Sequence, residues 1–240
     1  MTQTPYQPPV TVGAQAPSLI APYHYRSPRG LANWLTGALL AQAVSWGAMG
    51  TIDIVATLWV PGYSADEFAE TGLALVCDLM LIASLLVMLL TYAASIVLFL
   101  TWMYRACANA HALRSDRLRF TPGWTVAYWF IPILNLFRPY QVMCEIYRAS
   151  KPGSSETWNS SKLPGYMIAW WMCWIVGNIL GRLEMRAELG SVDLGGAALP
   201  LGITTTLLGT VAAILAVVVV RAVTSRQVIR AQELGAGRAH

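Results

Sequence analysis

Residues 102–150 read WMYRACANAHALRSDRLRFTPGWTVAYWFIPILNLFRPYQVMCEIYRAS. This stretch decides the fold, because a long apolar helix ends inside it and a polar, aromatic and proline-interrupted segment follows. Trp102, Arg105 and Asn109 are three and four residues apart, so they share one face of a helix. We expect them to form the polar end of the preceding membrane span.

A new helix is predicted to begin at Thr121-Pro122. The Thr121 hydroxyl would be its N-cap, and Pro122 would take the first helical position, where its missing N–H is not needed. The apolar run 123–137 that follows has 15 residues. A helix of that length covers about 22 Å, which is less than the ~30 Å of a hydrocarbon core. The run is therefore not expected to cross a membrane by itself.

Pro132 lies inside this apolar run. A proline ring clashes with the carbonyl group four residues earlier, so a kink or a break is predicted near Ile131. Backbone groups freed by a break inside lipid need other hydrogen-bond partners, and the Asn135 amide is placed to supply them. The alternative is that Pro132, Asn135 and Arg138 only stabilise a kinked helix.

A second short helix is predicted to begin at Arg138-Pro139. One side of it carries Gln141, Glu145 and Arg148, and the other carries Tyr140, Met143, Cys144 and Tyr147. An amphipathic helix of this kind suits a membrane surface. Arg138 and Glu145 are seven residues apart on one side, and we expect them to be polar anchors that share Arg105 or a water molecule.

The motif residues of this stretch resemble those of a known family. They are Trp102, Tyr104-Arg105, Asn109, Thr121-Pro122-Gly123-Trp124, Trp129-Phe130-Ile131-Pro132, Asn135, Arg138-Pro139-Tyr140 and Glu145. In these positions the chain is similar to the bacterial membrane family catalogued as domain of unknown function 4328. The resemblance implies a shared membrane fold centred on this segment, and it implies no particular activity.

The composition indicates a membrane protein. Of the 240 residues, 56% are hydrophobic and 12% are charged, and this charged fraction is about half of that in soluble domains. Four cysteines, at positions 77, 107, 144 and 173, show neither metal-ligand spacing nor a disulfide pattern. The three histidines are far apart, and no phosphate-binding loop or nucleophile motif is present. We therefore expect no enzymatic activity, no cofactor, no metal site and no nucleic-acid partner.

The hydrophobic runs predict an all-α, polytopic membrane protein. It would have four full spans, at residues 31–55, 72–103, 164–183 and 199–220, with the proline-broken segment re-entrant or interfacial between the second and third spans. The predicted domains are a disordered, Pro-rich cytoplasmic arm (1–28), a transmembrane domain (29–232) with 102–150 as its core motif, and a cytoplasmic tail (233–240).

Two polar side chains, Asp78 and Asn178, are predicted inside the membrane. An intramembrane carboxylate is a functional hypothesis by default. Asp78 lies near one end of its span, however, where protonation, water or a partner such as Asn178 also accounts for it. The pair Gly177-x-x-x-Gly181 is expected to allow close helix packing within the bundle rather than dimerisation.

The distribution of charge predicts the orientation. With four spans, 14 of the 16 Lys and Arg residues fall on the side that holds both termini, and only Arg182 and Arg186 fall on the other. The side with the termini then has a net charge of +10. Because basic loops remain in the cytoplasm, we predict a multi-pass protein of the bacterial cytoplasmic membrane with both termini cytoplasmic.

Two functions are compatible with this pattern. The first is a non-enzymatic membrane module whose basic inner face binds lipid headgroups, anionic ones in particular, or a protein partner or a second copy. If the bases only set the topology, the break at Pro132 has no explanation. The second is a small-solute transporter or channel that uses the broken helix around Pro132. The candidate binding residues are Arg105, Asn109, Trp129, Pro132, Asn135, Arg138 and Glu145.

Overall fold

The computed structural model describes residues 23–59, 72–113, 118–153 and 161–235. Every regular element within these ranges is a helix, as the all-α prediction requires. In chain order they are α1 (Arg29–Trp59), α3 (Gly72–Leu113), α4 (Pro122–Ala127), η1 (Leu134–Leu136), α5 (Arg138–Ala149), α6 (Gly165–Glu188), η3 (Gly195–Ala197) and α7 (Ala198–Glu233). Most of the predicted arm, 1–22, and the end of the predicted tail, 236–240, lie outside the described residues.

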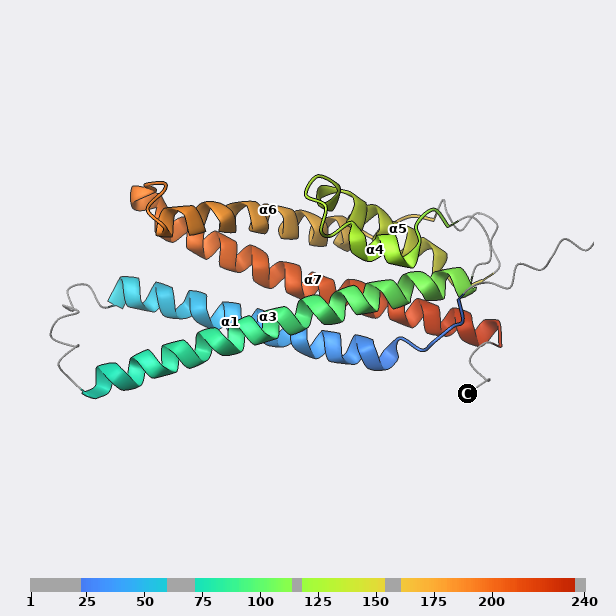
Figure 1. The fold of residues 1–240 in the computed structure, drawn as a ribbon, viewed down its shortest axis with the longest axis horizontal. Helices are drawn as coiled ribbons and strands as arrows, with labels where there is room; N and C mark the ends of the chain where they lie inside the picture. Colours follow the sequence, from blue (N-terminus) through green and yellow to red (C-terminus); the bar gives the residue numbers. More distant parts are fainter. Residues whose placement is uncertain (1–22, 60–71, 114–117, 154–160, 236–240) are drawn as a thin grey trace, which may run out of the picture.

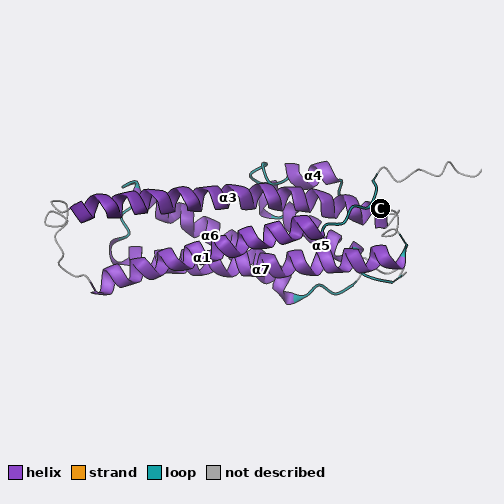
Figure 2. Cartoon of the chain, turned by 90° about the horizontal axis from the view of Figure 1, so that it is seen from below, coloured by secondary structure: helices purple, strands orange, loops and turns teal. Residues whose placement is uncertain are grey.

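Four long helices, α1, α3, α6 and α7, run along the length of the molecule and alternate in direction along the chain (Figure 1). α7 packs against both α6 and α1, and α3 packs against α1. Figure 2 shows the same bundle from a second direction. We call the end where α3 and α7 finish the inner end, and the end where α1 and α6 finish the outer end. α1 and α6 both begin toward the inner end.

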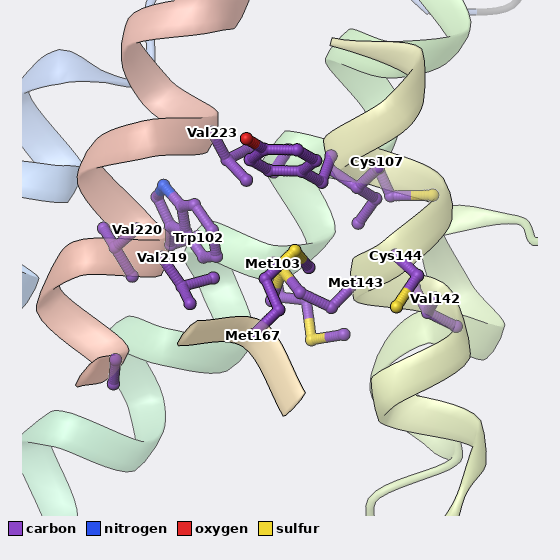
Figure 3. Packing of buried hydrophobic residues seen from close by; sticks show 14 of the residues in the cluster. Trp102, Met103, Cys107, Val142, Met143, Cys144, Met167, Val219, Val220 and Val223 are labelled. Carbon is purple, nitrogen blue, oxygen red and sulfur yellow. The ribbon is translucent and has the colours of Figure 1, made fainter. Parts of the chain in front are cut away.

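The best-packed part of the core lies toward the inner end. Trp102 of α3 lies beside Val219 and Val220 of α7 (Figure 3). Met103, the next residue, meets Met143 of α5 and belongs to the same buried cluster (Figure 3). The end of α3 is therefore held between α7 on one side and α5 on the other.

The outer part of α3 is exposed on several sides, and its exposed side chains are apolar. They include Leu79, Ile82, Leu85, Leu86, Val87, Leu89, Leu90, Ile96 and Val97. Contiguous apolar surface on this scale is rare on soluble monomers and typical of contact with lipid or a partner.

Within the described part of the chain, two helices are long and apolar enough to cross a membrane, at Leu85–Leu113 and Gly195–Glu233. This finding favours association with a membrane, but it does not support the four full spans expected from the sequence. One reason lies in α6, whose last two turns carry Arg182, Glu184 and Arg186 and so lower its hydropathy.

Small residues allow α7 to pack closely against its neighbours. A Cβ atom added to Gly177 of α6 would lie 3.5 Å from Cβ of Leu208. At Gly209 of α7 the same atom would lie only 2.3 Å from the ring of Trp46 on α1. The space beside Gly181 is open. The predicted packing role is therefore confirmed for Gly177 and wrong for Gly181.

Candidate functional site

The central motif folds into a helical hairpin. α4 ends at Ala127, the chain turns through residues 128–133 and the single turn of η1, and α5 begins at Arg138. Pro132 lies exposed in the turn, so the predicted break near Ile131 and the predicted helix start at Arg138 are both confirmed. The hairpin enters from the inner end of the bundle and returns toward it (Figure 1). We call residues 122–149 the hairpin and residues 128–137 its tip.

The tip reaches only part of the way along the bundle. The Trp129 ring packs edge-to-face against Trp171 and Trp174 of α6, with centroid distances of 6.1 and 5.3 Å. Trp174 comes nine residues after α6 begins at Gly165, about 14 Å along the helix axis. This depth is less than the ~30 Å thickness of a hydrocarbon core.

Trp129 is the centre of the aromatic cluster that fixes the tip. Its ring centroid lies 5.5 Å from that of Phe99 on α3, and its indole N–H donates to Sδ of Met103 at 3.4 Å. From α5, Tyr140 stacks on Trp171 at 6.1 Å. Aromatic pairs of this kind contribute about 0.5–1.5 kcal/mol each beyond their buried area. The predicted binding residue Trp129 is thus engaged in attaching the hairpin to α3 and α6.

The opposite face of the hairpin is apolar and uncovered. Phe130 and Ile133 are 72% and 73% exposed, and Leu136 and Trp124 are also more than half exposed. Four exposed apolar side chains of this size beside a proline turn are unusual for a protein in water. The surface suits the hydrocarbon of a lipid leaflet.

The predicted N-cap at Thr121 is wrong in its chemistry. Thr121 has the extended backbone that a cap requires, but its hydroxyl makes no capping hydrogen bond. Its carbonyl oxygen instead accepts bonds from both the N–H and the hydroxyl of Thr125, at 3.0 and 3.1 Å. Pro122 occupies the start of α4, as predicted.

Asn135 does not supply its side-chain oxygen to the broken backbone. Its main-chain N–H donates to the carbonyl of Ile131 at 2.8 Å and so closes the turn. Its Oδ1 atom is buried and has no hydrogen-bond partner among the described residues. The side-chain oxygen of Asn135 therefore does not accept a hydrogen bond from the freed backbone groups, and this part of the expectation is wrong.

Arg138 lies over three aromatic rings. Its Cζ atom is 5.9 Å from the ring centroids of Phe120 and Tyr128, and 5.7 Å from that of Phe137. One guanidinium nitrogen donates to Oε1 of Gln141 at 3.1 Å. The half-buried side chain of Arg138 extends back to Phe120, which lies two residues before α4.

Glu145 anchors the segment that leads into α4. Its Oε1 accepts a short hydrogen bond from the N–H of Arg119, and the N–H of Phe120 also points to this carboxylate. Burial outweighs these bonds and raises the pKa of Glu145. Within the described residues neither Arg138 nor Arg105 shares a hydrogen bond with Glu145, so the predicted sharing of Arg105 is wrong. Sharing through a water molecule stays a prediction.

The second helix is more deeply buried than its amphipathic pattern indicated, and its place at a membrane surface stays a prediction. Eight of the 12 residues of α5 are buried, Glu145 among them. The apolar side packs on α3 and α6, whereas residues 118–121 cover the side that carries Glu145. The sequence pattern showed which side was polar, but not that another part of the chain would cover it.

Trp102 and Asn109 face α7 and the N-terminal segment. The Trp102 indole N–H donates to Oγ1 of Thr224 at 3.1 Å. Nδ2 of Asn109 donates to Oε1 of Gln227 at 3.2 Å, and Gln227 in turn donates to the carbonyl of Ala106. Asn109 is 1% exposed, and both polar atoms of its side chain have partners within the protein. Arg105, on the same predicted face, is half-buried.

Several bases of the inner end bind main-chain or hydroxyl oxygens of the protein itself. Arg226 donates to the carbonyl of Tyr147 at 3.1 Å and lies 3.8 Å above that ring. Arg148 donates to the carbonyl of Ser161, and Arg221 donates to the hydroxyl of Thr36. The sequence shows these bases but not their structural role, which is to join α7 to α1 and α5, and α5 to the loop before α6.

The two predicted intramembrane polar residues lie on different helices. Asp78 belongs to α3, but its side chain lies outside the described structure. Nδ2 of Asn178 donates to the carbonyl of Trp174, one turn earlier in α6, at 2.7 Å. Nothing in the described structure pairs them. Among the residues with described positions, no three His, Cys, Asp or Glu side chains are grouped for a metal ion.

Comparison with known proteins returns one result. No curated protein and no solved structure matches the chain. The model of the family described as domain of unknown function (DUF4328) matches residues 65–225, which include α3, the hairpin, α6 and most of α7. The match covers more than half of the sequence, so the chain belongs to the DUF4328 family.

Proposed function

We propose that this protein is an integral membrane protein with four spans, α1, α3, α6 and α7, and with both termini in the cytoplasm. The parallel arrangement of the four helices supports this (Figure 1). The inner end, which carries most of the bases, would face the cytoplasm in accordance with the positive-inside rule. The hairpin would then enter the cytoplasmic leaflet and leave on the same side.

At this inner end the protein is proposed to act as a non-enzymatic module that binds anionic lipid headgroups. The observation that carries the proposal is the uncovered apolar face of the hairpin at partial depth, next to exposed bases. Arg29, Arg119 and Lys162 are exposed there. A base near an anionic membrane surface contributes about 1 kcal/mol of attraction.

Mass spectrometry of lipids that co-purify with the full-length protein tests this proposal. We expect anionic phospholipids to be enriched over the bulk membrane, and the enrichment to fall when Arg29, Arg119 and Lys162 are replaced together by Gln. A bound-lipid composition equal to that of the bulk membrane contradicts the lipid role. A stoichiometric protein partner or a stable homo-oligomer without such enrichment supports the alternative use of this face.

A transporter or channel is the second candidate. Two buried polar atoms without described partners favour it: Oδ1 of Asn135 in the tip, and Nε2 of Gln42 on α1. Broken helices and unpaired polar groups at membrane depth are features from which transporters build substrate sites. Solute flux into vesicles that contain the protein should fall for Asn135→Ala, and unchanged flux contradicts this candidate.

A further inference from the structure

Arg138 differs in its surroundings from three other arginines of the inner end. Arg148, Arg221 and Arg226 each donate to an oxygen atom of another segment of the fold. The described partner of Arg138 is the amide of Gln141 in the next turn of the same helix, and Gln141 is exposed. No carboxylate in the described part of the chain pairs with Arg138. Most of its N–H donors are therefore available to an anion.

The aromatic rings around Arg138 orient the guanidinium. Phe120, Tyr128 and Phe137 place their centroids 5.7 to 5.9 Å from its Cζ atom. Contact of a guanidinium with ring faces restricts its rotation and leaves the N–H groups at its edge free. A planar, oriented guanidinium is the side chain best suited to bind two oxygens of a phosphate group.

Apolar side chains lie next to this charge. Phe130, Ile133 and Leu136 are exposed along the tip. Arg138 begins α5 directly after the tip, and its guanidinium lies level with Phe120, which precedes α4. A long basic side chain that reaches from apolar surroundings toward the membrane interface is the arrangement known as snorkelling. Charge on one side and apolar surface on the other match a phospholipid rather than a soluble anion.

We propose that Arg138, held between Phe120, Tyr128 and Phe137, binds the phosphate of a phospholipid in the cytoplasmic leaflet, whose acyl chains cover the apolar face of the tip. The proposal rests on the proposed function, because it requires the hairpin to lie in that leaflet. It goes further in naming one residue and one chemical group, and it separates this site from the general attraction of the basic inner end.

The test uses the full-length protein in nanodiscs of phosphatidylcholine mixed with phosphatidylglycerol. Native mass spectrometry after release from the disc counts the lipids that each protein retains. Arg138→Gln should lower the retention of phosphatidylglycerol about tenfold, as expected for a lost charge-assisted bond of ~1.4 kcal/mol. Arg138→Lys keeps the charge without the planar fork and should lower retention by a smaller factor. Arg186→Gln, which removes an exposed arginine of α6 at the outer end of the bundle, should leave retention unchanged.

Equal retention by the wild type and Arg138→Gln overturns the proposal, as does an equal loss in Arg186→Gln, which would show diffuse attraction only. If Arg138→Gln fails to fold, retention by Arg138→Lys equal to that of the wild type overturns it. Displacement of the retained lipid by inorganic phosphate would assign the site to a free anion instead. Labelling of a cysteine at Ile133 in the same discs reports hairpin insertion separately. Insertion without Arg138-dependent retention leaves the proposed function intact.

Discussion

The side-chain amide of Asn109 forms hydrogen bonds with both main-chain polar groups of Arg26. Its Oδ1 accepts from the main-chain N–H of Arg26 at 3.0 Å, and its Nδ2 donates to the carbonyl of the same residue at 2.9 Å. The pair joins the end of α3 to a segment 83 residues earlier in the chain. Because Asn109 also bonds to Gln227, one buried amide ties the N-terminal segment, α3 and α7 together.

Replacing Asn109 by Ala should destabilise the inner end by about 2–3 kcal/mol, because buried donors and acceptors lose their partners. The loss should appear as a lower unfolding midpoint in detergent and as faster hydrogen exchange in residues 23–28. Asn178→Ala is the matched control, since the described bond of Asn178 is to its own helix. Equal effects of the two substitutions would show that Asn109 has no special structural role.

Trp129 and Phe130 are adjacent aromatic residues with opposite surroundings. Trp129→Ala should cost about 3–5 kcal/mol, because it removes a large side chain packed between α3 and α6. Phe130→Ala should leave the stability in detergent nearly unchanged, because that side chain is 72% exposed. Thermal unfolding of the two variants checks this difference, and a greater loss in Phe130→Ala would contradict the observed orientation of the tip.

Gly209 is predicted to be intolerant of the smallest substitution. Gly209→Ala places a Cβ atom 2.3 Å from the Trp46 ring, so α1 and α7 must move apart at a cost of about 1–3 kcal/mol. Gly181→Ala meets open space and should not destabilise the bundle. Unfolding midpoints measured in the same detergent compare the two. A stable Gly209→Ala protein would mean that the contact between α1 and α7 is looser than described.

Glu145 should make stability depend on acidic pH. Burial raises the pKa of Glu145 in the folded protein. The stability gained from the bound proton is therefore complete below the ordinary pKa of a glutamate, and it is lost as pH rises through the folded pKa. The wild type should therefore lose stability relative to Glu145→Gln as pH rises over this range. His111, which lies nearby, is present in both proteins, so the comparison isolates the change at residue 145.

Unfolding midpoints of wild type and Glu145→Gln, measured at a series of acidic pH values, give this difference. A constant difference between the two proteins, or one that changes in favour of the wild type as pH rises, would contradict a raised pKa.

The break at Pro132 was predictable because its cause is local. A proline excludes the hydrogen bond and the geometry of a continuing helix wherever it occurs. The partners of Glu145 and Asn109 were not predictable, because they are main-chain groups of residues 119 and 26, brought close only by the complete fold. Periodicity showed that α5 has a polar side and could not show that the chain would bury it.

Part of the contact between α3 and α7 at the inner end has a signal in the sequence. Thr224 and Gln227 are three residues apart on the last helix, and both are buried. Their spacing matches a polar stripe facing the Trp102–Asn109 side of α3. The aromatic cluster had a weaker signal, since three tryptophans near the start of α6 also suit a membrane interface.

The central claim is that the hairpin enters and leaves on the cytoplasmic side. Single cysteines at Gly123, Lys162 and Leu189, in a protein without the four native cysteines, can be labelled from each side of intact cells with impermeant reagents. All three positions are exposed. The account predicts that Gly123 and Lys162 label only from the cytoplasm and Leu189 only from outside. Labelling of Gly123 from the cytoplasm and of Lys162 from outside would show that the hairpin crosses the membrane, and would contradict the account.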